Sequence, residues 1–195
     1  TNQSSKKPIL INDLKLIINV IGEENQSEKR KIRDRAIILV GFSGGFRRSE
    51  LVNIEYEDVE FVTEGVKIFV KRSKTDQSGE GMTKAIPHFI NSNYCPVKSL
   101  NEWFNKSGIK SGKIFDISDK SVALIIKKYV SLAGLDANKY AGHSLRSGFA
   151  TSTADAGAEE RNIMAMTGHK TTQMVRRYIQ EANLFKNNAL NKIKI

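Results

Sequence analysis

The chain has 195 residues, and its 31 Lys and Arg against 21 Asp and Glu give a formal net charge of +10. This length suits one domain with a proper hydrophobic core, and basic charge spread along the whole chain favours a polyanionic partner such as nucleic acid. No apolar run approaches the length of a membrane span, residues 1–8 lack the apolar core of a signal peptide, and the single cysteine, Cys95, excludes an internal disulfide. We therefore expect a cytoplasmic protein without membrane segments.

Three helices are predicted before residue 54. Apolar residues recur at positions 10, 14, 17, 18 and 21, which is the spacing of one buried helix face. Ser27 is typical of a helix cap, and the helix that follows it continues through the apolar run 36–42. Gly44 and Gly45 then allow a sharp turn that brings Arg47 to the start of a short third helix.

Between residues 58 and 89 the periodicity changes from helical to alternating. Val66, Ile68 and Val70 lie on one face of a predicted strand, and Lys67 and Phe69 lie on the other. A short turn at 63–65 and a long polar loop at 73–81 divide this region into three strands. We therefore predict a small antiparallel three-stranded sheet.

Helical patterns return after the sheet. Pro96 is tolerated in the first turn of a helix that stops at Gly108, and Trp103 is predicted to lie on its buried face. Ser118 or the residue after it caps the next helix. The helix after this cap is predicted over 122–132, and further helices are predicted over 143–156, 159–167 and from 172 onward. The predicted fold class is mostly α with one small antiparallel three-stranded β-sheet.

The segment 142–178 gathers reactive side chains. His143 and Arg146 are three positions apart, so on a helix they share a face and can address one anionic ligand. His169 follows a glycine at the end of the next predicted helix, and Tyr178 comes nine positions later. Taken singly, a His-x-x-Arg pair is usually structural, and a Gly-His pair commonly ends a helix. The ordered set is much less expected by chance.

Imidazole, guanidinium and phenol groups together suit the transfer of a phosphodiester. Attack by an oxygen nucleophile spreads negative charge over the phosphate oxygens, and fixed cationic donors that meet this charge are usually the largest catalytic term. Arginine binds two phosphate oxygens at once and stays protonated. A tyrosine nucleophile divides the transfer into two steps through a covalent ester. We predict neither a metal nor any other cofactor.

The ordered set resembles the catalytic C-terminal part of the tyrosine recombinase (phage integrase) family. The family also places an arginine in a Gly-x-Arg-x-Ser-Glu-Leu stretch, and residues 45–51 read Gly-Phe-Arg-Arg-Ser-Glu-Leu. The resemblance covers nearly the whole chain and implies the fold of the DNA breaking-rejoining enzymes. It further implies that residues 1–8 are a linker, that residues 9–195 are the catalytic domain, and that the family's N-terminal core-binding domain is absent from this chain.

The resemblance implies a metal-independent strand transferase with six catalytic residues, namely Arg47, Lys74, His143, Arg146, His169 and Tyr178. The tyrosine would attack the scissile phosphate and leave a 3′-phosphotyrosyl link with a free 5′ hydroxyl. The two arginines and His169 would stabilise the charged phosphate, and His143 would assist proton transfer at the tyrosine. Such chemistry serves DNA integration, excision or resolution.

The roles of three residues near these positions have alternatives, namely Arg48, Glu50 and Lys74. Arg47 lies in the register of the motif, so Arg48 is expected to face backbone phosphates or solvent instead. Glu50 would hold the Arg47 guanidinium from the same helix face, with an ordinary ion pair as the alternative. Lys74, on the predicted hairpin loop, would protonate the leaving oxygen; the alternative is a simple phosphate contact, because other basic residues lie close by.

The implied partner is double-stranded DNA, on which we expect a dimer or tetramer. Predicted contacts to the DNA backbone are Arg48, Lys71, Arg72, Arg176 and Arg177. Apolar side chains after residue 183 would pack on their own domain or on a neighbouring protomer. Two other functions are weighed: relaxation of DNA by a type IB topoisomerase, against which the recombinase-like spacing argues, and a DNA-binding module that has lost catalysis, against which the six occupied positions argue.

Overall fold

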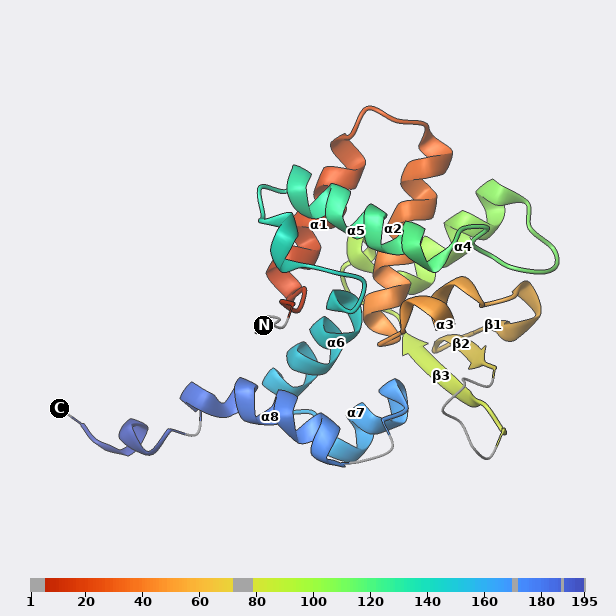
Figure 1. Ribbon diagram of the computed structural model, residues 1–195. Coiled ribbons are helices and arrows are strands. Elements are labelled where there is room, and N and C mark those ends of the chain that lie inside the picture. Colours follow the sequence, from red (N-terminus) through yellow and green to blue (C-terminus); the bar gives the residue numbers. More distant parts are fainter. Residues whose placement is uncertain (1–5, 72–78, 170–171, 187, 195) are drawn as a thin grey trace.

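A computed structural model describes residues 6–71, 79–169, 172–186 and 188–194 of the chain. A helical bundle forms its upper part in Figure 1, and a three-stranded sheet and the last helices lie below. The larger helices are α1 (Ile11–Glu23), α2 (Glu28–Ser43), α4 (Pro96–Ser107), α5 (Asp119–Leu132), α6 (Ser144–Asp155), α7 (Glu160–Thr167) and α8 (Thr172–Lys186). The predicted mostly helical class is confirmed. None of the helices in these residues combines the length and apolar character needed to span a bilayer.

Helix α2 is the centre of the bundle, because α1, α4, α5 and α6 all pack against it. Residues 36–42 of α2 are buried on every side, as their unbroken apolar sequence predicted. Ser27 caps this helix by accepting a hydrogen bond from the Arg30 amide. Trp103 on α4 is 5 % exposed and donates its indole N–H to the Ile114 carbonyl oxygen over 2.7 Å. We call the apolar interior around α2 the main core.

The sheet has the predicted order and direction. Strand β2 lies between β1 and β3, and both pairings are antiparallel. Val66, Ile68 and Val70 are buried and the residues between them are exposed, which is the alternation read from the sequence. The bounds are β1 (Val59–Val62), β2 (Gly65–Val70) and β3 (Met82–Pro87). Between β2 and β3, residues 72–78 lie outside the described residues.

Helix α6 is clamped near its start by the N-terminal segment. The Ile9 amide donates to the Ser144 carbonyl oxygen over 2.9 Å, and the Lys7 amide donates to that of Lys139 over 2.7 Å. Gly148 faces the Ile9 carbonyl so closely that a Cβ at this position would overlap it. Close packing made possible by this glycine therefore fixes the helix that carries Arg146.

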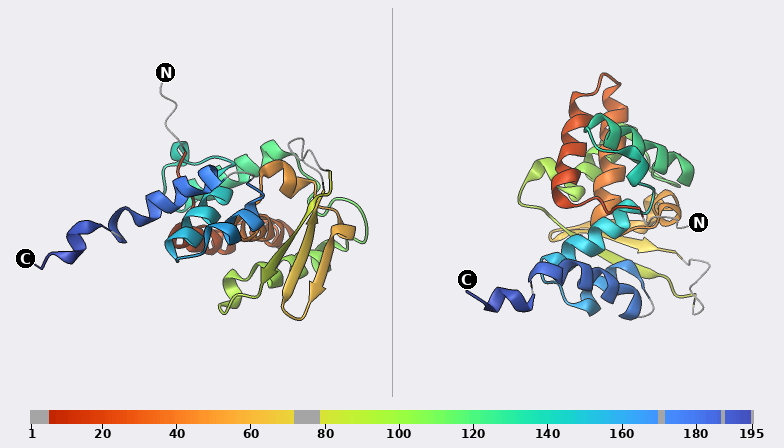
Figure 2. Two further views of the ribbon diagram at one scale, coloured as in Figure 1. Left: turned by 90° about the horizontal axis from the view of Figure 1, so that it is seen from below. Right: turned by 60° about the vertical axis from the view of Figure 1, so that its left-hand side comes forward.

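The remaining helices form what we call the C-terminal unit, consisting of α7 and α8 with the outer half of α6. Its own small core contains Phe149, Ala150, Ala154, Ile163 and Val175. Beyond α8 a short 3₁₀ helix (Ala189–Lys192) continues away from the body of the molecule. Figure 2 shows the same projection from two further directions. Short elements elsewhere are α3 (Arg48–Val52) and 3₁₀ turns at Tyr56–Asp58, Ser92–Tyr94 and Ala137–Lys139.

Candidate active site

Arg146 joins α6 to the turn before α3. Its side chain is 7 % exposed, and its Nη1 donates to the Gly45 carbonyl oxygen over 2.9 Å. Nη2 lies 3.3 Å from Nε2 of His169, so one guanidinium contacts segments far apart in sequence. Burial and the neighbouring Arg47 lower the pKa of Arg146 to about 10. The group still carries its charge at neutral pH.

Glu50 lies between the two predicted catalytic arginines. One carboxylate oxygen accepts a hydrogen bond from the Arg47 amide over 2.8 Å and lies 3.8 Å from Nη1 of Arg146. The other lies 3.9 Å from Nη1 of Arg47. The carboxylate thus serves both guanidiniums, whereas the sequence indicated a partner for Arg47 alone. Because 32 % of the Arg47 side chain stays exposed, its fork can still reach a ligand.

Lys84 is a buried cation to which the sequence patterns assigned no role. Its amine is fully buried, donates to the Gly44 carbonyl oxygen over 2.7 Å and lies 4.4 Å from the centre of the Phe46 ring. Burial lowers its pKa to about 8, against the opposing effect of Glu50. The inward register of β3, where Lys84 pairs with buried Ile68, was the available signal. The lysine holds the turn before Arg47 against the sheet.

His169 is placed by a helix end. Gly168 ends α7 in the left-handed region, with φ of 72°, and turns the chain so that the imidazole returns toward the arginines. Its Nδ1 lies 2.6 Å from the Thr167 hydroxyl. Burial, followed by Arg146 and Arg47, lowers the pKa of His169 to about 4. The ring is therefore neutral at neutral pH. We call Arg47, Glu50, Lys84, Arg146 and His169 the charged cluster.

Tyr178 lies beside this cluster. It is partly buried on α8, its ring centre is 6.2 Å from that of His169, and its proximity slightly opposes the lowering of the pKa of Arg146. The other four tyrosines have structural contacts: the hydroxyls of Tyr129, Tyr140 and Tyr94 donate to Asp34, Asp13 and Asn19, and the Tyr56 ring packs on Phe104. None of these four contacts involves a residue of the charged cluster.

His143 lies at the edge of the site. It precedes the first residue of α6 and is exposed, although burial and the nearby Arg48 still lower its pKa. The Arg48 side chain crosses Gly142 so closely that a Cβ there would overlap it. Arg48 therefore lies against the loop that carries His143.

The charged cluster does not include the other predicted residues. Lys74 and Arg72 lie outside the described residues. Lys71 is exposed and ion-paired with Glu55 and with Asp58, and the hydrogen bond to Glu55 raises its pKa. The two α8 arginines are exposed, with Arg176 Nε 3.6 Å from Glu160 and Arg177 Nε 3.7 Å from Glu181. Ion pairs between such exposed side chains contribute little energy.

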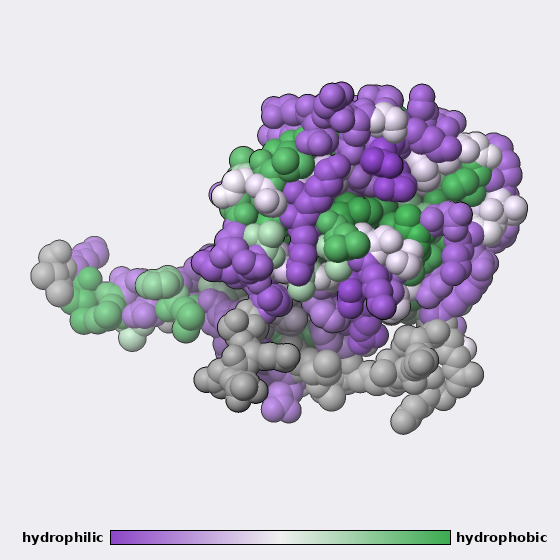
Figure 3. Space-filling model, turned by 45° about the horizontal axis from the view of Figure 1, so that its top comes forward, coloured by the Kyte–Doolittle hydropathy of each residue, from purple (hydrophilic) through white to green (hydrophobic). Residues whose placement is uncertain are grey.

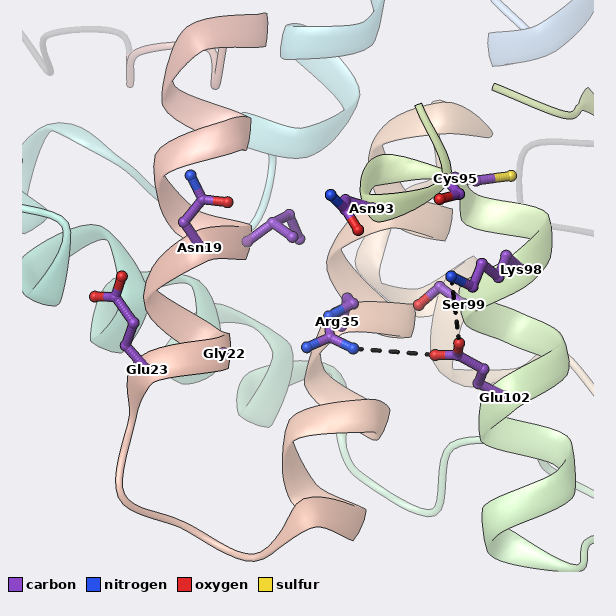
Figure 4. Close-up of a pocket in the computed structure, with 11 residues that line it drawn as sticks. Asn19, Gly22, Glu23, Arg35, Asn93, Cys95, Lys98, Ser99 and Glu102 are labelled. Atoms are coloured by element: carbon purple, nitrogen blue, oxygen red, sulfur yellow. Dashed lines mark ion pairs between the residues drawn. The ribbon is translucent and has the colours of Figure 1, made fainter. Parts of the chain in front are cut away.

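A separate cavity of about 380 Å³ lies between α1, α2 and α4 (Figure 4). The ion pair of Arg35 with Glu102 crosses it at 4.0 Å, and Lys98 pairs with Glu102 along α4 at 3.9 Å. None of the predicted catalytic residues that the structure describes lines it. Among the residues that the structure describes, no three His, Cys, Asp or Glu side chains gather as metal ligands.

Comparison with known proteins identifies the family of this chain. The model of the phage integrase family matches residues 11–184, which is most of the chain. The chain belongs to this family.

Two curated relatives illustrate the likeness. An integrase/recombinase xerD homolog from Selenomonas ruminantium is 47 % identical over 99 % of this chain and 59 % of its own length. A tyrosine recombinase from Agathobacter rectalis is 31 % identical over 81 % of the chain and 51 % of its own length. This phage integrase family chain therefore spans about half the length of the curated relatives it matches.

Solved structures share the fold. The XerH site-specific recombinase bound to its difH substrate in a post-cleavage complex matches with a TM-score of 0.73 at 17 % identity, over 95 % of this chain and 54 % of that one. A lambda integrase dimer bound to a COC′ core site matches with a TM-score of 0.69, also at 17 % identity, over 100 % of this chain and 53 % of that one. The predicted fold of a tyrosine recombinase catalytic domain is confirmed.

Proposed function

We propose that this chain is the catalytic part of a site-specific recombinase that cuts and rejoins double-stranded DNA through a 3′-phosphotyrosyl intermediate. One observation carries the proposal: a tyrosine lies beside a charged cluster in which Arg146 contacts both the Arg47 turn and His169. Family membership supports it. The relatives whose structures hold DNA are named for recombination substrates, which favours the same partner here.

In the proposed first step, the Tyr178 oxygen attacks the scissile phosphorus. The bond from phosphorus to the tyrosine oxygen forms as the bond to the 5′ oxygen of the next nucleotide breaks. The phenol proton leaves through His143 or solvent, and the departing oxygen takes a proton from Lys74. A 5′ hydroxyl then attacks the phosphotyrosyl ester and reverses these roles. The energy of the broken phosphodiester bond is thus conserved in the phosphotyrosyl ester.

The charged cluster supplies the stabilisation of the transition state. Arg47 and Arg146 present planar forks to the phosphate oxygens. Glu50 directs Arg47 from 3.9 Å, and the Gly45 carbonyl oxygen and Glu50 direct Arg146 through its Nη1. Removing a fixed donor of this kind typically costs about 10²- to 10³-fold in rate. We propose that these cations, with His169, do this without a metal ion.

Assembly is the second part of the proposal. The C-terminal segment exposes apolar side chains, seen in green along the projection in Figure 3, and they are Leu184, Phe185, Leu190 and Ile193 at 64, 86, 69 and 57 % exposure. Exposed apolar side chains that are grouped in this way mark a site of contact with another protein surface. We propose that it docks on a neighbouring protomer when two or four copies bind DNA.

A trapping assay tests the chemistry. The chain is offered a nicked DNA substrate that releases the 5′ fragment, with and without EDTA, and covalent protein–DNA adduct is measured. Tyr178→Phe removes one oxygen, so adduct should vanish while folding and DNA binding persist. Tyr94→Phe, which also removes a hydroxyl, should retain the adduct. Adduct formed by Tyr178→Phe, or lost in EDTA, would contradict the mechanism. Exchange between two sites, beyond plasmid relaxation, separates a recombinase from a topoisomerase.

A further inference from the structure

Thr167 is a buried polar residue next to the site that has no role in the chemistry above. It is the last residue of α7 and only 1 % exposed. Its hydroxyl lies 2.6 Å from Nδ1 of His169 and 3.1 Å from the Ile163 carbonyl oxygen. We propose that this hydroxyl, together with Arg146, fixes which ring nitrogen of His169 carries the proton and holds the ring so that Nε2 faces the phosphate site. The proposal rests on the proposed function.

The donors around the ring leave one proton arrangement. Arg146 can only donate hydrogen bonds, so Nε2 of His169, 3.3 Å from its Nη2, must be the accepting nitrogen. In a neutral ring the proton then lies on Nδ1, which donates to the Thr167 hydroxyl oxygen. The hydroxyl hydrogen is left to bond the Ile163 carbonyl. Every donor in this series of hydrogen bonds meets an acceptor.

This arrangement gives the threonine a positioning role. When a phosphate enters, the Arg146 fork turns to it and Nε2 faces the same oxygens. Nε2 can then take a proton from solvent and donate to the phosphate, while Nδ1 keeps its bond to Thr167. Without the hydroxyl, the Nδ1 proton would lose its acceptor and face an apolar group, and Arg146 alone would oppose a shift of the proton to Nε2. A proton on Nε2 would point at Arg146 in the free protein.

Charged or titratable groups face the His169 ring from several elements. They are Arg146 on α6, Arg47 before α3, Lys84 on β3 and Tyr178 on α8. The cations disfavour a second proton on the free ring. The Thr167 methyl group packs against Gly45, where an added Cβ would lie 3.3 Å from it. Valine would preserve this packing and remove only the hydroxyl.

The test uses ¹⁵N-histidine-labelled chain. Ring nitrogen shifts are recorded near neutral pH for wild type, Thr167→Val and Thr167→Ser, and His169→Gln assigns the signals among the three histidines. Wild type should show a neutral ring with its proton on Nδ1. Thr167→Val should move the proton toward Nε2 and slow adduct formation about tenfold or more at saturating DNA. Thr167→Ser should restore both. Thr153→Val is the matched control, because the Thr153 hydroxyl makes the same kind of bond, 2.7 Å to the Phe149 carbonyl, away from any histidine.

The outcomes separate this inference from the proposed function. A wild-type ring protonated on Nε2, or a Thr167→Val chain with unchanged tautomer and rate, would overturn the role of Thr167. If Thr167→Val does not fold, the wild-type and Thr167→Ser shifts still decide. A wild type that forms no adduct contradicts the proposed function, and the nitrogen shifts then judge the tautomer alone.

Discussion

The main core and the C-terminal unit divide the candidate site between them. The main core surrounds α2 with side chains that are almost completely buried, such as Ile17, Ile37 and Tyr129. Among the residues that the structure describes, the small core of the C-terminal unit has five buried side chains, and its last helix leads into an exposed segment. Arg47 and Lys84 are anchored on the main-core side, whereas His169 and Tyr178 belong to the C-terminal unit.

This division separates the residues that would stabilise the transition state from the proposed nucleophile. Charges that stabilise a transition state work best when they are fixed in advance, and the turn before Arg47 is held by the Lys84 amine and by Arg146. A nucleophile has to approach the phosphate and later release it. Elements with few buried apolar contacts open at lower free energy, so we expect the unit that carries Tyr178 to move more easily than the arginines.

Arg146→Ala should have the largest effect. The guanidinium is the direct contact between the Gly45 turn and His169, so its loss removes both charge and a link between the two regions. We expect adduct formation to fall by about 10²- to 10³-fold or more. Arg161→Ala is the control, because that side chain is exposed on α7 and paired with Glu159. Equal rates for the two variants would show that the cluster is not the catalytic centre.

Two matched isoleucines compare the cores directly. Ile37 and Ile163 are 0 and 1 % exposed, one in the main core and one in the C-terminal unit. Ile37→Ala should lower the free energy of unfolding by about 4 kcal/mol, and Ile163→Ala by about 2 kcal/mol. Urea titration measures both. Hydrogen exchange in Ile163→Ala should accelerate in α7 and α8 and stay slow in α2; a uniform acceleration would mean that the two regions unfold as one.

The pH dependence of stability tests the surroundings of His169, where the C-terminal unit meets the arginines. The pKa of His169 is about 4 in the folded chain and about 6.5 when unfolded. Between these values the unfolded state binds a proton that the folded state does not, so stability falls as pH falls from about 6.5 and the loss levels off below about 4. His169→Gln should flatten this part of the curve in urea unfolding from about pH 4 to 7.5. Parallel curves for the two proteins would contradict it.

Phe185→Ser should have the smallest effect on the isolated chain. The side chain is 86 % exposed, so unfolding free energy should change by no more than about 0.5 kcal/mol. Assembly on DNA, measured by gel shift or light scattering, should nevertheless weaken if the segment docks on a neighbour. Phe61→Ser on β1 is a less exposed comparison, since its ring contacts Phe104. Intact assembly by Phe185→Ser would place the protomer contact elsewhere.

Sequence periodicity determined most of the fold. Helical spacing in α1, the apolar run in α2 and the alternation in β2 are local signals. Each matched the structure because all the apolar residues of such a pattern favour the same buried face. The spacing of His143, Arg146, His169 and Tyr178 also indicated the family. The predicted role of Lys74 stays a prediction, as it lies outside the described residues.

Tertiary structure alone decided how the charges are held. Glu50 serves both arginines, Lys84 reaches the Gly44 carbonyl, and the Thr167 hydroxyl meets the His169 ring. The contacts of Glu50 with Arg146 and of Lys84 with Gly44 join residues 40 or more positions apart. The contact of Thr167 depends on the left-handed turn at Gly168. No periodic pattern encodes such pairings, because a single polar residue on an inward face gains its partner only when another segment packs against it.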